Sequence, residues 1–237
     1  RLGSVFKFYK IAENFGILYI NKNRIEELGQ IYGLENIFRI QRYVKMAQLT
    51  TISRDTTNGY VALEEIGANF FKNNPNINID GRGVIIGIAN SGIDYLHPDF
   101  IYPDGTSKIL YLWDQTIDGN SPEGFNIGTE YTREDINKAI AENNPNLSID
   151  EEGIGTALSG ICTGLGNLND QYKGVAEGSD LVIVKVKKID GFYNSATLVA
   201  ATKYIYSKGI KEEKPVVQNI NLGSNNSIVR GTDLLVD

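Results

Sequence analysis

The sequence predicts an α/β fold: a doubly wound parallel sheet, preceded by a small α+β domain. Two nearly unbroken apolar segments, GVIIGIAN at 83–90 and LVIVKV at 181–186, have the composition of strands buried on both faces of a parallel sheet. Helical patterns alternate with these strands, whereas residues 1–48 have the pattern of a small sheet with one helix. Functional sites in a doubly wound sheet lie outside the carboxyl ends of the strands, so we expect one near Asn90 and the loop after it, the segment near Lys187, and residues 222–225.

Composition limits the classes of function. The chain has 237 residues, 41% of them hydrophobic, which is enough for one substantial core and a second small domain. Its 23 basic and 29 acidic residues give a net charge of −6 without a basic block, which argues against a nucleic-acid partner. A single cysteine, Cys162, excludes an internal disulfide, and we expect a small buried hydrophobe there rather than a reactive thiol. No apolar run approaches the roughly 18 residues of a membrane span, and the amino-terminal segment lacks a secretory h-region.

The small amino-terminal domain is assigned to residues 1–48. Its segment FGILYI at 15–20 has the composition of a strand, and IFRIQRYV at 37–44 alternates as a strand with one wet face requires. Between these strands, Asn23 and Glu26 form a capping-box-like pair that begins a predicted helix.

A connector is predicted for residues 49–78, because QLTTISRDTTNGY is polar and aperiodic. The second domain, residues 79–237, contains two predicted helices. One begins at Thr132 in TREDINKAIAE, and the other runs from Ser195 to Gly209 with an apolar inner stripe. The segment VVQNINLG supplies a further strand.

Four segments of the second domain, in order, resemble the subtilisin-like serine proteases. GVIIGIANSGIDYLHPDF is similar to the first signature of that family, with Asn90 where the catalytic aspartate stands. GIGTALSGICTG at 153–164 resembles Gly-His-Gly-Thr-His-Val-Ala-Gly, with Ile154 at the histidine position. GVAEGSDLVIVKV resembles the next strand and its approach, and VVQNINLG resembles the strand that pairs with substrate backbone.

The resemblance implies a subtilisin-like fold that is incomplete at its carboxyl end. Residues 79–237 would form the first part of a protease domain, and residues 1–48 would be a propeptide-like domain. Within residues 79–237, Asn221, Leu222 and Gly223 would form the substrate-binding strand.

The two replaced positions remove the chemistry of a serine protease. The histidine takes the serine proton and returns it to the leaving amine, while the aspartate orients the imidazole. Ile154 has no titratable group, and loss of this histidine in subtilisin lowers turnover on the order of a millionfold. Asn90 keeps shape and hydrogen bonding but carries no charge. GTDLL at 231–235 has Asp233 in place of a serine and comes too soon after the second signature to supply the nucleophile.

Other side chains offer no substitute constellation. The one histidine, His97, lies in the His-Pro-Asp segment, where a turn-stabilising role is expected. Cys162 has no second histidine to activate it as a nucleophile. The carboxylates are interpreted as solvated loop charges, with acid pairing or cation binding as the alternative; they are Asp94, Asp99, Glu151 and Glu152. The sequence predicts no catalytic residue, no cofactor and no metal.

Further segments are similar to the Csp group, the germination proteases of spore-forming clostridia. These segments are YPDGTSKILYLWDQT and PEGFNIGTEYTREDINKAI. That group contains active members, which cleave the pro-form of a cortex-degrading enzyme, and inactive members that take part in germinant signalling. With two catalytic positions replaced, the chain resembles the inactive, CspA-like type. The resemblance implies a location in the bacterial spore, protein partners such as other Csp proteins or a carboxyl-terminal fragment, and a small-molecule germinant as a further candidate ligand.

Three functions compete at this point. The chain is a pseudoprotease that acts by binding in germination signalling, or an active endopeptidase whose catalytic groups lie outside this chain. In the third alternative, residues 1–48 act as an inhibitor or folding chaperone for a protease domain. The absence of a base at Ile154 favours the first.

Overall fold

The computed structural model describes residues 6–13, 15–21, 23, 24, 27, 45–48, 63–72, 74, 76, 77 and 79–223. Its strands are β1 Phe6–Ala12, β2 Phe15–Ile20, β3 Lys45–Gln48, β4 Ile85–Asn90, β5 Ile109–Asp114, β6 Thr129–Thr132, β7 Asp180–Lys185, β8 Tyr193–Asn194, β9 Val216–Ile220 and β10 Leu222–Gly223. Its helices are α2 Ala68–Lys72, α3 Arg133–Ala141, α4 Ile154–Thr163 and α5 Ser195–Lys211.

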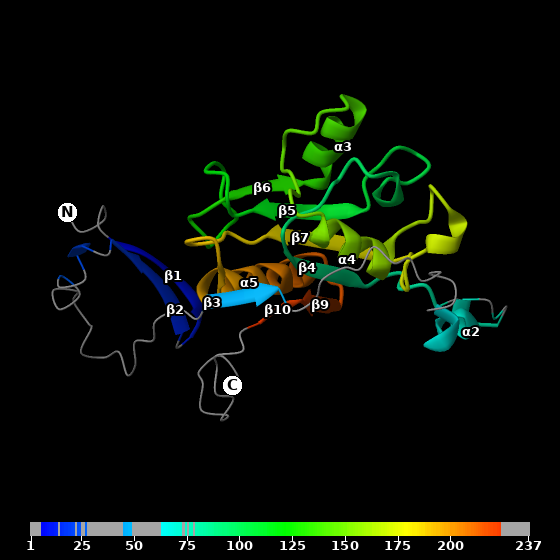
Figure 1. Ribbon diagram of the computed structural model, residues 1–237, viewed down its shortest axis with the longest axis horizontal. Helices are drawn as coiled ribbons and strands as arrows, with labels where there is room; N and C mark the ends of the chain where they lie inside the picture. Colours follow the sequence, from blue (N-terminus) through cyan, green and yellow to red (C-terminus); the bar gives the residue numbers. More distant parts are fainter. Residues whose placement is uncertain are drawn as a thin grey trace.

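A five-stranded sheet forms the centre of the molecule, in the order β6-β5-β7-β4-β9 (Figure 1). Strands β5, β7, β4 and β9 are parallel, and β6 is an antiparallel edge strand. The predicted parallel-rich α/β sheet is therefore confirmed. Asn90 is in register with Lys185, so the carboxyl ends of β4 and β7 meet at one edge of the sheet.

Helices cover the two faces of this sheet, and each face has its own core. On one face, Ala201 and Ile205 of α5 pack with Val182 of β7. On the other face, Ile136 of α3 packs with Ile88 of β4. Because β4 is buried along its whole length, its six residues read as an apolar run without alternation.

The predicted helix starts are confirmed, but one predicted end is wrong. Thr132 and Asp135 form a capping box, and the Thr132 amide donates to Asp135 Oδ2 at 2.9 Å. Helix α5 begins at Ser195, where the Asn194 side chain accepts from the Thr197 amide. It continues past Gly209 to Lys211. A Cβ on Gly209 would lie 2.1 Å from Val216 Cγ2, so this glycine serves close packing against β9 and does not end the helix.

The strands predicted for residues 79–223 lie where the sequence predicts them and differ in extent. The predicted strand at 83–90 begins at Ile85, and the one at 181–186 runs from Asp180 to Lys185. VVQNINLG divides into β9 and β10, with Asn221 between them. Sequence analysis assigned neither β5 nor β6, although ILYLWD in β5 is buried at all six positions.

The amino-terminal hairpin of β1 and β2 is antiparallel, and the strand predicted for FGILYI is confirmed. The predicted strand 37–44 and most of the predicted helix between the two strands lie outside the described residues. The hairpin packs on α5: Ile17 joins the same core as Leu198, and Lys203 Nζ donates to the Lys10 carbonyl oxygen at 2.8 Å. No helix of the described part is long and apolar enough to cross a membrane.

Candidate strand-binding cleft and replaced catalytic positions

Asn90 is the last residue of β4 and is 1% exposed. Its parity places it on the sheet face that carries Ile86 and Ile88, and its Oδ1 accepts from the Ser91 amide at 2.8 Å. An amide side chain at this position is neutral at any pH near neutrality, so it cannot stabilise a neighbouring cation by charge.

Ile154 is the first residue of α4, directly after Gly153, whose φ of 69° is left-handed. The Gly155 amide donates to Ser91 Oγ at 2.9 Å. A Cβ on Gly155 would lie 2.0 Å from the Gly92 carbonyl oxygen, so only glycine permits this close start of the helix. The start of α4, at Ile154, therefore lies against the turn that follows Asn90 at the carboxyl end of β4.

A row of three polar side chains crosses this edge. Asn90 on β4, Lys185 on β7 and Asp114 on β5 are in register. Lys185 Nζ donates to the Ile149 carbonyl oxygen at 2.5 Å and pairs with Glu151 Oε2 at 2.7 Å. The hydrogen bond from Lys185 lowers the pKa of Glu151, which remains largely exposed. The lysine beside Asn90 thus holds the segment that leads into α4.

A second ion pair extends this segment toward β8. Glu152 pairs with Lys188, and the Tyr193 hydroxyl donates to Glu152 Oε2 at 3.5 Å. Lys188 Nζ also lies 4.6 Å from the centroid of the Tyr193 ring. Burial raises the pKa of Tyr193, and the carboxylate of Glu152 adds to this, so the phenol stays protonated and remains a donor.

The other predicted candidates serve turns and packing. His97 Nδ1 accepts from the Asp99 amide and caps a short 3-10 helix, which is the turn role that the sequence predicts. Asp99 Oδ1 accepts from the Asn167 amide, and Asp94 Oδ1 from the Leu96 amide. The prediction that these carboxylates are solvated loop charges is therefore incomplete. Asp94 and Asp99 accept hydrogen bonds from backbone amides, and Glu151 and Glu152 form ion pairs with lysines. The described residues contain no cluster of three or more His, Cys, Asp or Glu side chains arranged for a metal.

Cys162 lies inside α4 and packs against the core on that face. Burial raises the pKa of its thiol, and its Sγ is 3.9 Å from Asn219 Nδ2. A nucleophilic cysteine needs a lowered pKa, so the predicted packing role fits these surroundings.

A small three-stranded sheet has the strand order β10-β3-β8 (Figure 1). β3 lies between the other two strands and is antiparallel to both. Leu222 is in register with Gln48, and Met46 with Tyr193. Strand β10, with Asn221 just before it, is the strand that the sequence predicts for substrate binding. β10 pairs with β3, which belongs to the amino-terminal part of the chain. The predicted domain boundary after residue 48 therefore falls at the end of a strand that pairs with the second domain.

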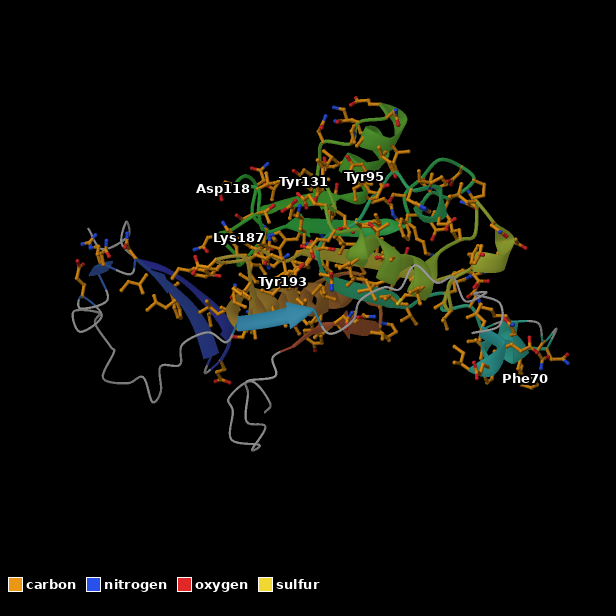
Figure 2. The ribbon with its side chains drawn as sticks, in the orientation of Figure 1. Phe70, Tyr95, Asp118, Tyr131, Lys187 and Tyr193 are labelled. Carbon is orange, nitrogen blue, oxygen red and sulfur yellow. The ribbon has the colours of Figure 1, made fainter. Side chains whose placement is uncertain are left out.

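These features define the candidate cleft: β8 and β10 with the position between them that β3 occupies, which we name the groove, and Asn90 and Ile154 at the carboxyl edge of the neighbouring sheet. Tyr193, which forms part of β8, lies beside β3 in Figure 2. β8 and β10 each pair with β3 through antiparallel main-chain ladders. Neither Asn90 nor Ile154 can accept or donate a proton in the way that a general base requires.

The sequence indicates a site near Lys187, but it does not single out three side chains that contribute to this region: Lys185, Lys188 and Tyr193. One signal was present for Lys185, since a lysine interrupts the otherwise apolar LVIVKV at the carboxyl end of the strand. The adjacent acids Glu151 and Glu152, just before the second signature, were the matching signal. The ion pairs Lys185–Glu151 and Lys188–Glu152 join residues that are 34 and 36 positions apart in the sequence, so they form only in the folded protein.

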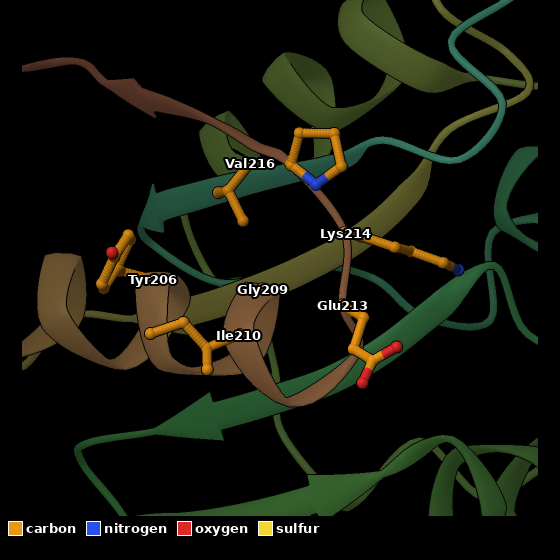
Figure 3. A pocket seen from close by; sticks show the side chains of 7 residues that line it. Tyr206, Gly209, Ile210, Glu213, Lys214 and Val216 are labelled. Carbon is orange, nitrogen blue, oxygen red and sulfur yellow. The ribbon is translucent and has the colours of Figure 1, made fainter.

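A separate hollow lies between the end of α5 and the start of β9 (Figure 3). Tyr206 and Ile210 line it and are 61% and 63% exposed, with Val216 on the opposite side. None of the replaced catalytic positions or the residues of the groove lines this hollow.

Comparison with known proteins agrees with this architecture. Residues 81–234 match the Subtilase family. The solved structure of the Clostridium perfringens CspB protease superposes with a TM-score of 0.60 at 30% identity, over 68% of this chain and 33% of that one. A psychrophilic protease gives a TM-score of 0.46 at 22% identity, over 72% of this chain and 45% of that one. The chain spans about a third of the length of the CspB protease. Since the family match extends over well more than half of its residues, the chain belongs to the Subtilase family.

Proposed function

We propose that the protein is a catalytically inactive subtilase of the Csp type, which acts by binding in the regulation of spore germination. One observation carries the proposal: a hydrocarbon side chain, Ile154, begins the helix that lies against the turn after Asn90. Both groups that would move or stabilise a proton in a protease are replaced by groups that do neither.

The cleft supports a binding role that needs no catalytic side chain. Strand addition gives affinity through main-chain hydrogen bonds, and the groove between β8 and β10 already holds β3 in this way. Each flanking strand is in register with only two residues of β3. We propose that an extended segment of a partner protein competes with β3 for this groove. The amino-terminal part then acts as an intramolecular inhibitor of binding, which joins the first and third of the competing functions.

A second surface supports a protein partner. In the described part of the chain, β9 is the outer strand of the central sheet, and its Val217 and Ile220 are 59% and 43% exposed. Tyr206 and Ile210 add apolar surface beside it (Figure 3). An exposed strand edge of this kind pairs readily with further polypeptide. We propose that a protein segment covers it, supplied by another Csp-type protein or by a carboxyl-terminal fragment. Location in the spore and response to a germinant follow from the resemblance to the Csp group and are proposed with it.

The test is active-site labelling of the complete purified protein with a fluorophosphonate probe, alongside peptide cleavage. We expect no labelling and no cleavage, because no imidazole can activate a nucleophile at the position of Ile154. A CspB-type protease treated in parallel shows that the probe works. Labelling of the unmodified protein would refute the proposal.

The similarity to a protein described as a protease favours one alternative, an endopeptidase that processes a cortex-lytic pro-enzyme with groups outside this chain. Casein cleavage that disappears when a serine outside residues 1–237 is mutated would establish that alternative. Restoration variants carrying Asn90→Asp and Ile154→His separate the two: activity only after restoration supports the inactive state of the natural sequence.

A further inference from the structure

Residues 148–152, which we name the acidic segment, are bound to the ends of neighbouring strands before α4 begins. Ser148 Oγ donates to Asp114 Oδ2 on β5 at 2.7 Å, and Lys185 on β7 holds Ile149 and Glu151. The last contact, from Glu152, reaches Tyr193 on β8. The segment therefore contacts β5, β7 and β8 in turn and leads directly into α4.

Glu152 fixes the Tyr193 side chain from two directions. It accepts from the Tyr193 hydroxyl, and it pairs with Lys188, whose ammonium lies over the Tyr193 ring. Tyr193 is 3% exposed and is in register with Met46 of β3. Tyr193 is one of the two residues of β8 that pair with β3.

We propose that Glu152 is a positioning residue that sets β8 for strand binding, so that breaking its contacts with Lys188 and Tyr193 releases β3 from the groove. The inference rests on the proposed binding function and names how the same cleft is regulated. The pair is suited to this role, because the side chains of Lys188 and Glu152 are 36% and 34% exposed. Solvent ions and the charges of an arriving protein reach a pair of this kind and weaken it.

Glu151 provides a matched control next in sequence. It carries the same charge, but it pairs with Lys185 on β7, and none of its hydrogen bonds or ion pairs in the described part of the chain reaches β8. A general effect of lost negative charge would act at both positions, whereas a positioning effect acts at Glu152.

Hydrogen exchange of the full protein, measured by mass spectrometry, tests the inference on the amides of β3. Glu152→Gln should raise exchange in β3 about threefold, the scale of a partly exposed ion pair. Glu151→Gln should leave it unchanged. Glu152→Lys should raise exchange further, and adding Lys188→Glu should return it toward the natural rate. Exchange in β4 serves as the measure of global stability and should stay constant in all variants.

Three results would overturn the inference: unchanged β3 exchange in Glu152→Gln, equal effects of Glu151→Gln and Glu152→Gln, or no recovery in the charge swap. Each readout is independent of peptide cleavage. If the probe labels the natural protein, the proposed function fails, while the exchange pattern still decides whether Glu152 positions β8.

Discussion

The two parts of the cleft differ in what the side chains must supply. At the catalytic positions, a protease depends on an imidazole and a carboxylate, and Asn90 and Ile154 provide neither. In the groove, β8 and β10 hold β3 through main-chain groups, which side-chain replacement leaves in place. The difference teaches that the two requirements are separable in principle, because proton transfer depends on particular side chains whereas strand pairing depends on the main chain.

The largest expected effect concerns Lys108, a buried lysine outside the cleft. Lys108 is fully buried, its Nζ donates to the Glu177 carbonyl oxygen at 2.5 Å, and burial lowers its pKa from 10.5 to about 8. Between these pH values the unfolded chain binds a proton that the folded protein lacks, so stability rises with pH by up to about 3 kcal/mol. Urea unfolding from neutral pH to about pH 10 measures this rise. Lys108→Met should remove it, and a rise that persists in this variant would assign the titration to another group.

A second experiment disrupts the close contact between the start of α4 and the turn that follows Asn90. A Cβ at Gly155 meets the Gly92 carbonyl oxygen, so Gly155→Ala should cost about 2 kcal/mol of unfolding free energy. Gly160→Ala in the same helix is the control, because a Cβ there meets no atom within 4 Å. That change should stabilise by about 0.5–1 kcal/mol. Chemical denaturation of both variants measures the contrast, and equal values would contradict the close approach.

A third change tests whether the two parts are separable. Ile154→Ala removes a half-buried side chain and should cost about 1 kcal/mol of stability. Hydrogen exchange of β3 should stay at the natural rate, because the groove does not depend on this side chain. Faster exchange in β3 would show that the replaced position supports strand binding and would end the contrast.

The smallest effect is expected at Glu151. Its side chain is 67% exposed, so Glu151→Gln should cost less than about 1 kcal/mol near neutral pH. The pKa of Glu151 is lowered by Lys185, so its contribution is present above the ordinary value of 4.5 and is lost as the pH falls through the lowered value. Thermal unfolding of both proteins at neutral and acid pH should converge at low pH. A difference that persists in acid would show that the carboxylate charge is not the cause.

The sequence predicts β4, β7 and β9 of the central sheet. It does not predict contacts that depend on which distant segments pack together. The apolar run of β4 and the capping residues of α3 act locally, so their positions were correct. Gly209 was assigned as a helix end, although Val216 approaches it from a later strand. The lysines that bind the acidic segment were missed, because side chains far apart in sequence meet only after the sheet is assembled.

By itself, the sequence determined that an asparagine stands at position 90 and an isoleucine at position 154, and that the chain has the apolar strands of a parallel α/β sheet. Both follow from residue identity and local periodicity. Only the tertiary structure decided that β3 fills the groove between β8 and β10, and that the acidic segment joins this groove to the start of α4. Strand partners and ion pairs between distant residues are selected by the geometry of the assembled fold, because no local rule fixes which edge a short strand joins.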